Sequence, residues 1–325
     1  MFLKKQRRLI QLWNQLVEKD HETLNVVPIG RGHTGKTNLI NSIPRALDTL
    51  PSGIRLGYND LKLLNEALAQ VRRTEQDLLR GGLPPTLERS YRSIGLYFEE
   101  VEQLKLQVSD EIGQPITNTT PDSPKEQVQR FNEYVNAAAD ADVLWVTTSL
   151  PVTNSSQSLG LFRDDLARYQ CWLSESIRDR TDQNPVSVAI VIPKIDAIFE
   201  TEEEAARQLT EDWLTNQTLK PLVDVVRKGI KRGWVKKGAV VPVSAFGFGN
   251  SRLIEKDSEA SIAYEDHEEE FVLRDLAGLN PFNVLTLLVW SFYAAVSAKE
   301  GPAFRKLEEA LSDDMEAVGK WIIQI

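Results

Sequence analysis

The residues best suited to chemistry lie near the start of the chain, in the pattern Gly30-x-x-x-x-Gly35-Lys36-Thr37. Glycines at these positions let the backbone turn tightly, so that its amides can face phosphate groups. Lys36 can reach the outer phosphates, and the Thr37 hydroxyl can ligate Mg²⁺. The predicted phosphate site takes in the whole loop: Gly30, Arg31, Gly32, His33, Thr34, Gly35, Lys36 and Thr37.

The segments on either side of this loop fit the same chemistry. An apolar run from Asn25 to Ile29 precedes it, and apolar residues at helical spacing follow it from Leu39 to Leu47. In a strand, loop and helix of this kind, the helix N-terminus adds its dipole to the loop amides. A glycine-rich turn with an incidental lysine is the alternative, and the flanking pattern argues against it.

A second chemical pattern comes after two strand-like runs. Ser93 to Phe98 and Leu104 to Val108 are separated by an acidic turn and predict a β-hairpin, whose second strand leads to Asp110-x-x-Gly113-Gln114. After a phosphate loop, a carboxylate at a strand end can hold the Mg²⁺ shell, and a glycine amide can contact the terminal phosphate. Gln114 lies where a glutamine could orient water. An ordinary turn and a surface glutamine are the alternatives.

The elements that must position these residues alternate along the chain. Three more apolar strands are predicted at Asp140 to Thr148, Val186 to Pro193 and Ala239 to Gly247, with a helix at 125–138 before the first of them and helices at 159–178 and 202–231 between them. Such alternation predicts an α/β fold of three layers, with helices on both faces of a sheet. We expect a mostly parallel six-stranded sheet with one antiparallel hairpin strand, a helical insertion and terminal helices. Ligands of such sheets lie at the carboxyl ends of the strands, where each pattern falls.

The chain is expected to divide into an N-terminal amphipathic helix at 1–22, a main domain at 23–300 with a helical insertion at about 50–82, and a C-terminal helix at 301–325. The N-terminal helix is expected to pack on its own domain, with a membrane-surface or partner contact as the alternative. Residues 276–298 carry no charge, but their strongly apolar part is shorter than the ~20 residues of a bilayer span, so a core helix is expected. The C-terminal helix places Leu307, Leu311 and Ile322 on one apolar stripe and is expected to pack on the core, with a partner-binding or oligomerising helix as the alternative.

Composition limits the function further. The chain has 325 residues and a net charge of -9, which argues against a nucleic-acid-binding surface. A single cysteine, Cys171, cannot form an internal disulfide, so a reducing cytoplasm is expected. The three histidines are scattered and offer no metal-ligand spacing.

The order of these patterns resembles that of Ras-like and translation-factor-like GTPases. The series comprises the phosphate loop, Pro-Pro-Thr86, Asp110-x-x-Gly113-Gln114, Lys194-Ile-Asp196 and Ser244-Ala245, and it covers roughly Leu24 to Ala298. The resemblance implies a P-loop NTPase fold, GTP or GDP as the ligand and Mg²⁺ as the cofactor. It also implies that Thr86 joins Thr37 and Asp110 around the metal, that Gly113 contacts the terminal phosphate and that Gln114 positions the attacking water.

The same resemblance implies which residues recognise the nucleotide base. Asp196 would accept two hydrogen bonds from guanine, Lys194 would lie along the ring, and the amide of Ala245, after Ser244, would donate to the guanine carbonyl. Leaving a carboxylate of this kind unpaired is costly, so it discriminates against other bases. The family usually has Asn or Thr before the lysine. Here Pro193 supplies neither a side-chain hydrogen bond nor a backbone donor.

The function implied is a switch that hydrolyses GTP through Lys36, Thr86 and Gln114 and presents two conformations to effector or regulator proteins. The helical insertion and the string Asn280-Pro-Phe282 look like those of a bacterial subgroup whose members often work in multi-protein signalling or conflict systems. Candidates for an arginine finger within the chain, each with a solvent- or phosphate-facing position as the alternative, are Arg31, Arg89 and Arg92. Two other functions stay open: an ATPase of the same fold, and a nucleotide-binding scaffold with little hydrolysis.

Overall fold

The computed structural model describes residues 23–30, 34–58, 61–79, 90–98, 101–110, 138–150, 156–178, 180–181, 184–248, 251–254, 270–273, 280–319 and 321–325. The predicted N-terminal helix and nearly all of the helix predicted at 125–138 lie outside these residues.

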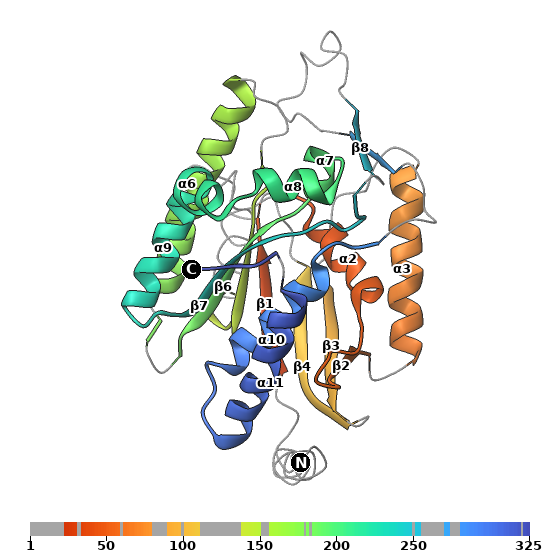
Figure 1. The fold of residues 1–325 in the computed structure, drawn as a ribbon, viewed down its shortest axis with the longest axis vertical. Coiled ribbons are helices and arrows are strands. Elements are labelled where there is room, and N and C mark those ends of the chain that lie inside the picture. Colours follow the sequence, from red (N-terminus) through yellow and green to blue (C-terminus); the bar gives the residue numbers. More distant parts are fainter. Residues whose placement is uncertain are drawn as a thin grey trace, which may run out of the picture.

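An eight-stranded sheet forms the centre of the molecule, with the strand order β10-β7-β6-β5-β1-β4-β3-β2 (Figure 1). The strands are β1 (Thr23–Ile29), β2 (Arg55–Gly57), β3 (Ser90–Phe98), β4 (Val101–Asp110), β5 (Val143–Thr147), β6 (Val186–Ile192), β7 (Val235–Pro242) and β10 (Ile323–Gln324). The central run from β4 through β1, β5 and β6 to β7 is parallel. β3 is antiparallel to β4, which confirms the predicted hairpin.

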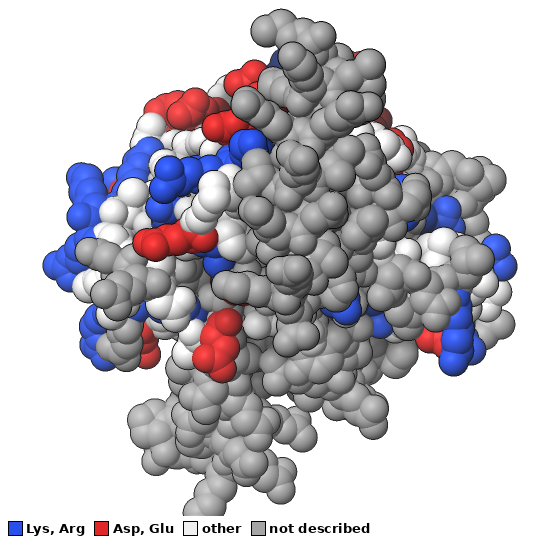
Figure 2. Space-filling view, turned by 90° about the horizontal axis from the view of Figure 1, so that it is seen from below, with Lys and Arg blue, Asp and Glu red and all other residues white. Residues whose placement is uncertain are grey.

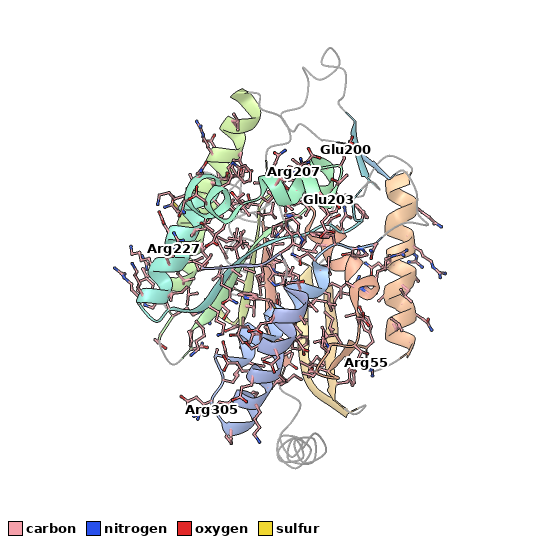
Figure 3. All side chains as sticks on the ribbon, in the orientation of Figure 1. Arg55, Glu200, Glu203, Arg207, Arg227 and Arg305 are labelled. Carbon is pink, nitrogen blue, oxygen red and sulfur yellow. The ribbon has the colours of Figure 1, made fainter. Side chains whose placement is uncertain are left out.

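The predicted number of strands, six, was too small because both edges of the sheet carry a short extra strand. At one edge β2 pairs antiparallel with β3, and at the other β10 pairs antiparallel with β7. Neither strand is long enough to show an alternating pattern. On the first edge lies Arg55 (Figure 3). Its guanidinium lies 4.4 Å from the centre of the Tyr97 ring, and this cation–π contact joins β2 to β3.

Helices cover both faces of the sheet, as predicted. On one face pack α2 (Lys36–Ala46), α10 (Val284–Val296) and α11 (Pro302–Val318). On the other face pack α6 (Ser156–Arg178), α7 (Ile195–Ile198), α8 (Glu202–Gln208), η1 (Trp213–Thr218) and α9 (Lys220–Lys231). The predicted insertion contains α3 (Leu61–Leu79), which packs against α2, and β8 (Ser251–Ile254) and β9 (Glu270–Leu273) form a separate hairpin.

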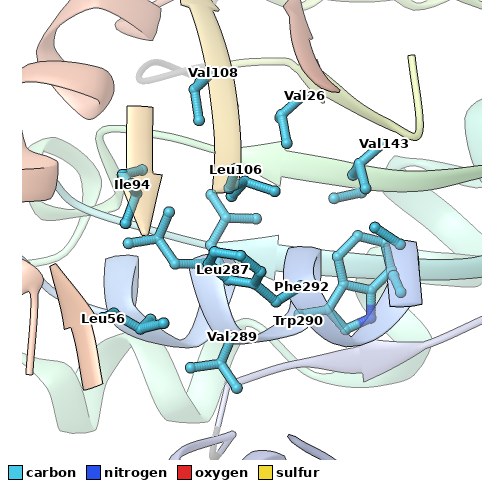
Figure 4. Packing of buried hydrophobic residues seen from close by; sticks show 14 of the residues in the cluster. Val26, Leu56, Ile94, Leu106, Val108, Val143, Leu287, Val289, Trp290 and Phe292 are labelled. Carbon is cyan, nitrogen blue, oxygen red and sulfur yellow. The ribbon is translucent and has the colours of Figure 1, made fainter. Parts of the chain in front are cut away.

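The apolar helix α10 is a core helix, as the sequence predicted. It lies directly against the sheet, where Leu287, Trp290 and Phe292 pack among strand residues (Figure 4). A polar residue of the helix, Ser291, has a hydrogen-bond partner on the sheet. The indole nitrogen of Trp145 on β5 donates to Ser291 Oγ at 2.9 Å. None of the helices in the described part of the chain combines the length and apolar character that a membrane span needs.

The C-terminal helix is shorter than predicted. α11 buries Leu307 and Leu311 as expected but ends at Val318, and the chain then forms β10. The spacing of Ile322 fits the apolar stripe of a longer helix, but the residue lies beyond the end of α11. Gly319 is a poor helix residue and the tail that follows is rich in isoleucine, so pairing with the open edge of β7 is favoured over another helical turn.

Candidate functional site

The glycine-rich loop joins the carboxyl end of β1 to the start of α2. A Cβ atom at Gly30 would lie 2.0 Å from the Oγ1 atom of Thr147 and 2.6 Å from its carbonyl oxygen, so no side chain fits there. Gly35 has a φ of 90°, a left-handed conformation that favours glycine. Both glycines are therefore required by the shape of the loop. Residues 31–33, which include the predicted Arg31, Gly32 and His33, lie outside the described residues.

Lys36 is buried within this loop, with 5% of its surface exposed. Its Nζ atom donates a hydrogen bond to the Gly30 carbonyl at 2.7 Å and a longer one to Thr34 Oγ1 at 3.5 Å. A buried ammonium group needs such acceptors. The side chain thus spans the loop from its last residues to its first.

Residues at the end of β5 make hydrogen bonds to the loop, a contact that the sequence did not predict. Thr147 is fully buried, and its hydroxyl donates to the Ile29 carbonyl at 2.8 Å and shares a hydrogen bond of 3.3 Å with the Thr34 hydroxyl. The carbonyl of Thr34 also accepts from Ser149 Oγ at 3.5 Å. A polar residue at the end of an otherwise apolar strand was the available signal, because a buried hydroxyl must find partners.

Lys194 and Asp196 follow β6 and lie beside the loop. Lys194 has a φ of 61° and caps the short helix α7, and its aliphatic stem covers Gly35, where a Cβ atom would lie 3.3 Å from Lys194 Cε. Asp196 in the first turn of α7 is 6% exposed. The pattern Lys194-Ile-Asp196 therefore places one long apolar stem and one buried carboxylate next to the phosphate loop.

Ser244 and Ala245 follow β7, the next strand of the sheet. The Ser244 hydroxyl accepts from the amides of Phe246 at 3.1 Å and Gly247 at 2.8 Å, which closes a tight turn. Residues Ser244–Gly247 are called the base loop below. Its Ala245 and Phe246 lie beside Lys194, because β6 and β7 are parallel neighbours whose carboxyl ends meet at one edge.

Residues from three strand ends line one small pocket. Its walls are Gly35, Asn38, Leu39, Pro193, Lys194, Asp196, Ala245 and Phe246. The space between these walls is about 20 Å³, room for about one water. The Oδ1 atom of Asn38 is buried and has no hydrogen-bond partner among the described residues. Sequence reasoning missed Asn38, although it directly follows the predicted metal ligand Thr37.

The other predicted site residues are placed only in part. Asp110 is the last residue of β4, which pairs in parallel with β1, so its backbone reaches the same edge of the sheet as the loop. Thr37 lies in the first turn of α2. Thr86, Gly113 and Gln114 lie outside the described residues, and so does the candidate arginine finger Arg89.

Arg92, the third candidate for an arginine finger, is engaged elsewhere. Its Nη2 atom donates to Asn41 Oδ1 on α2 at 3.3 Å and to Gln70 Oε1 on α3. The guanidinium therefore ties the inserted helix to the phosphate-loop helix, a structural contact that the sequence did not predict.

Charge is unevenly spread over the molecule. The view from below shows Lys and Arg gathered on the side where α9 lies (Figure 2). α9 ends with the exposed residues Lys228 and Lys231 and is followed by exposed Arg232. Positive side chains at a helix C-terminus are stabilised by the helix dipole, which accounts for this cluster without a ligand. Among the described residues, no group of His, Cys, Asp or Glu side chains is arranged to hold a metal ion by itself.

Strand order, strand direction and the loop after β1 together define the P-loop NTPase fold. No known protein family matches the chain, and no curated protein resembles it in sequence. Among solved structures, the chain is similar to a variant of Era from Aquifex aeolicus bound to GDP and AlF4⁻, with 14% identity and a TM-score of 0.31. The match covers 69% of this chain and 52% of that one, so the chain spans about half the length of that protein. A similarity of this extent carries no information about function.

Proposed function

We propose that this protein binds GTP with Mg²⁺, hydrolyses it to GDP and acts as a switch on partner proteins. The observation that carries the proposal is the shared pocket beside the phosphate loop. Three patterns that are far apart in the sequence, at Gly35, Lys194 to Asp196 and Ala245, line the same small space. A phosphate loop alone accepts any nucleoside triphosphate, whereas the residues beside it read the base.

Guanine suits the chemistry of this pocket. Asp196 is buried and would accept from the ring amide and the exocyclic amine of guanine, and the Ala245 amide would donate to its carbonyl. Adenine offers neither that pair of donors nor that acceptor. The stem of Lys194 and the ring of Phe246 supply apolar surface for the base, and the buried Oδ1 of Asn38 offers a further acceptor to a ligand that donates.

Mg²⁺ fits the oxygen donors at the loop. Thr37 lies in the first turn of α2, and the backbone of Asp110 ends the neighbouring strand β4 at the same edge of the sheet. In this proposal both residues would ligate the ion together with phosphate oxygens. Oxygen ligands of this kind, few from the protein and several from phosphate and water, are what Mg²⁺ prefers. When bound, the ion would neutralise charge on the phosphates, while Lys36 and the loop amides bind the same groups.

Hydrolysis requires an oriented water. In this proposal Gln114 and the carbonyl of Thr86 hold the water in line with the terminal phosphate, and Lys36 stabilises the charge that develops. Loss of the phosphate would release the segments around Thr86 and Gly113, which would change the surface seen by an effector or regulator.

The first test is the nucleotide that stays with the purified protein after expression, identified by chromatography of the denatured sample. GDP or GTP is expected. Titrations with GDP, ADP and XDP would then compare the wild type with Asp196→Asn and Lys36→Ala. Asp196→Asn should weaken GDP binding by about a hundredfold and improve XDP binding, because the new amide donates where xanthine has a carbonyl. Lys36→Ala should abolish binding of all three.

The ATPase alternative predicts preferential binding of ADP and no effect of Asp196→Asn. Single-turnover hydrolysis of bound GTP, with wild type and Gln114→Ala in parallel, decides between an enzyme and a scaffold. A rate in the wild type that falls at least about tenfold in the variant supports the switch. Absence of turnover in both would refute the enzymatic part of the proposal.

A further inference from the structure

The base loop is held by a segment that lies about 35 residues further along the chain. Residues Asn280–Asn283, called the brace, run beside Ser244–Gly247. The amide of Ser244 donates to the Phe282 carbonyl at 3.0 Å, and the amide of Phe282 donates back to the Ser244 carbonyl at 2.9 Å. The amide of Asn280 also donates to the Phe246 carbonyl at 3.1 Å. The brace therefore adds three backbone hydrogen bonds to the base loop, beside the two that the Ser244 hydroxyl accepts within it.

Close packing strengthens this contact. Gly247 has a φ of 84°, and a Cβ atom there would lie 2.2 Å from the Asn280 carbonyl oxygen. The two backbones are in close contact here, so a displacement of the brace would leave a gap between Gly247 and Asn280.

Asn283 fixes the brace to two other parts of the protein. It precedes α10 at a φ of 59° and makes no capping bond with its side chain, although Asn is a favoured capping residue. Its Nδ2 atom instead donates to the Pro242 carbonyl at 2.7 Å and to the Trp321 carbonyl at 3.0 Å. One side-chain amide thus joins the end of β7, two residues before the base loop, to the C-terminal tail.

The tail itself lies on β7. Ile323 pairs with Val240 and Gln324 with Ala239, and the Ile325 amide donates to the Gly238 carbonyl at 2.9 Å. Aromatic contacts run along the same line, since the Phe282 ring centre lies 5.4 Å from that of Trp321 and 4.9 Å from that of Phe248. A strand of two residues at a sheet edge is held by few backbone hydrogen bonds, and Trp321, Ile323 and Ile325 add apolar contacts with the core.

We propose that Asn283 is a positioning residue for base recognition, and that it makes nucleotide affinity depend on whether the C-terminal strand is docked on β7. This inference rests on the proposed function, because it names the part of the chain through which that site is regulated. A partner that takes up the tail would remove one of the two acceptors of Asn283 and the aromatic contact to Phe282. The base loop would loosen and nucleotide would leave faster. By linkage, bound nucleotide would hold the tail on β7.

Two variants of Asn283 and one matched control test the inference. Asn283→Gly keeps the positive φ at little cost and removes both hydrogen bonds, and Asn283→Asp keeps the size but turns an acceptor toward two carbonyls. The control is Thr286→Val, which removes the bond from Thr286 Oγ1 to the Val318 carbonyl at 2.9 Å. It lies in the first turn of the same helix and also joins α10 to the C-terminal region, but its hydroxyl donates to Val318 and not to the brace.

Dissociation of a fluorescent GDP analogue is the first readout. The rate is expected to rise about tenfold in Asn283→Gly, a loss of about one net hydrogen bond, and further in Asn283→Asp, while Thr286→Val stays within about twofold of the wild type. A role in filling space alone predicts that Asn283→Asp behaves like the wild type. Equal rates in the Gly variant and the control would overturn the inference.

Hydrogen exchange of the nucleotide-free protein is the second readout and separates this inference from the proposed function. The amides of Ser244 and Phe282 should exchange faster in both Asn283 variants than in Thr286→Val. If the wild type binds no guanine nucleotide, the proposed function and the regulatory part fail together, and exchange still decides whether Asn283 holds the loop. Unchanged exchange at both amides would refute the positioning role itself.

Discussion

Replacing Gly30 by alanine is a direct test of how the phosphate loop is built. The new Cβ would lie 2.0 Å from Thr147 Oγ1 and 2.6 Å from the Thr147 carbonyl oxygen, and real Cβ atoms do not approach other atoms so closely. The hydroxyl cannot swing aside freely, because it donates to the Ile29 carbonyl at 2.8 Å. The loop backbone or the end of β5 must move, and overpacking of this kind costs about 2 to 3 kcal/mol.

The loss should appear in two measurements. Urea unfolding should show a lower free energy of unfolding with an unchanged slope, and nucleotide affinity should fall at least about tenfold, because the carbonyl that Lys36 contacts belongs to Gly30. Gly160→Ala is the matched control. Gly160 lies exposed within α6 with no atom within 4 Å of an added Cβ, so that change should stabilise the protein by about 0.5 to 1 kcal/mol.

A second substitution refines the test. In Gly30→Ala, adding Thr147→Ala removes the nearer clash but leaves the carbonyl and also deletes the hydrogen bond to the Ile29 carbonyl, so stability should recover only in part. A Gly30→Ala protein that unfolds at the wild-type urea concentration and binds nucleotide as tightly would refute the proposed shape of the loop.

Two further predictions concern buried polar groups. Burial raises the pKa of Asp314, although hydrogen bonds from Ser52 at 2.8 and 2.6 Å act in the opposite direction, so the folded protein holds this proton more tightly than the unfolded chain. The stability it contributes is present below its ordinary pKa, near 3.8, and is lost as pH rises through the raised value, so Asp314→Asn should gain stability relative to the wild type as pH rises above the ordinary pKa, measured by urea unfolding. Ser291→Ala should cost about 1 to 3 kcal/mol in the same assay, because it leaves the buried indole nitrogen of Trp145 without its acceptor; an unchanged midpoint would contradict that role.

The parts of the fold that the sequence predicted well share one property. β5, β6 and α10 are buried on nearly every side, so their residues form continuous apolar runs whose ends are marked by polar residues. The two edge strands carry no such signal. β2 has three residues and β10 has two, and their pairing depends on an open edge elsewhere in the sheet rather than on their own composition.

Residues of the candidate site also differ in whether the sequence predicted them. Gly35, Lys194, Asp196 and Ala245 were predicted from the order of their patterns, and the structure brings them to one pocket. Thr147 and Asn283 were not predicted, because each makes hydrogen bonds to residues far along the chain, and Asn38 was not predicted, because only the fold places it in the pocket wall. Single polar residues of this kind have no spacing to recognise. Thr86 and Gln114 lie outside the described residues and stay predictions.

At Pro193 this chain departs from the sequence pattern of the GTPases that it resembles. The surroundings of Pro193 in the structure allow the effect of this departure to be tested. The residue is buried in the wall of the pocket, and its Cβ lies 3.6 Å from the position of a Cβ on Gly35. Proline therefore packs against the phosphate loop where an asparagine could donate to it. Pro193→Asn should tighten GDP binding by up to about tenfold by adding one hydrogen bond between β6 and the loop.

Pro193→Ala is the control, since it restores the backbone N–H without adding a side-chain donor. Its affinity for GDP should stay at or below that of the wild type in an isothermal titration. If the alanine variant binds as tightly as the asparagine variant, the missing backbone donor is the cause and the side-chain argument fails. If neither variant changes affinity, packing by proline is as effective as a hydrogen bond, and the base is held by Asp196 and the base loop alone.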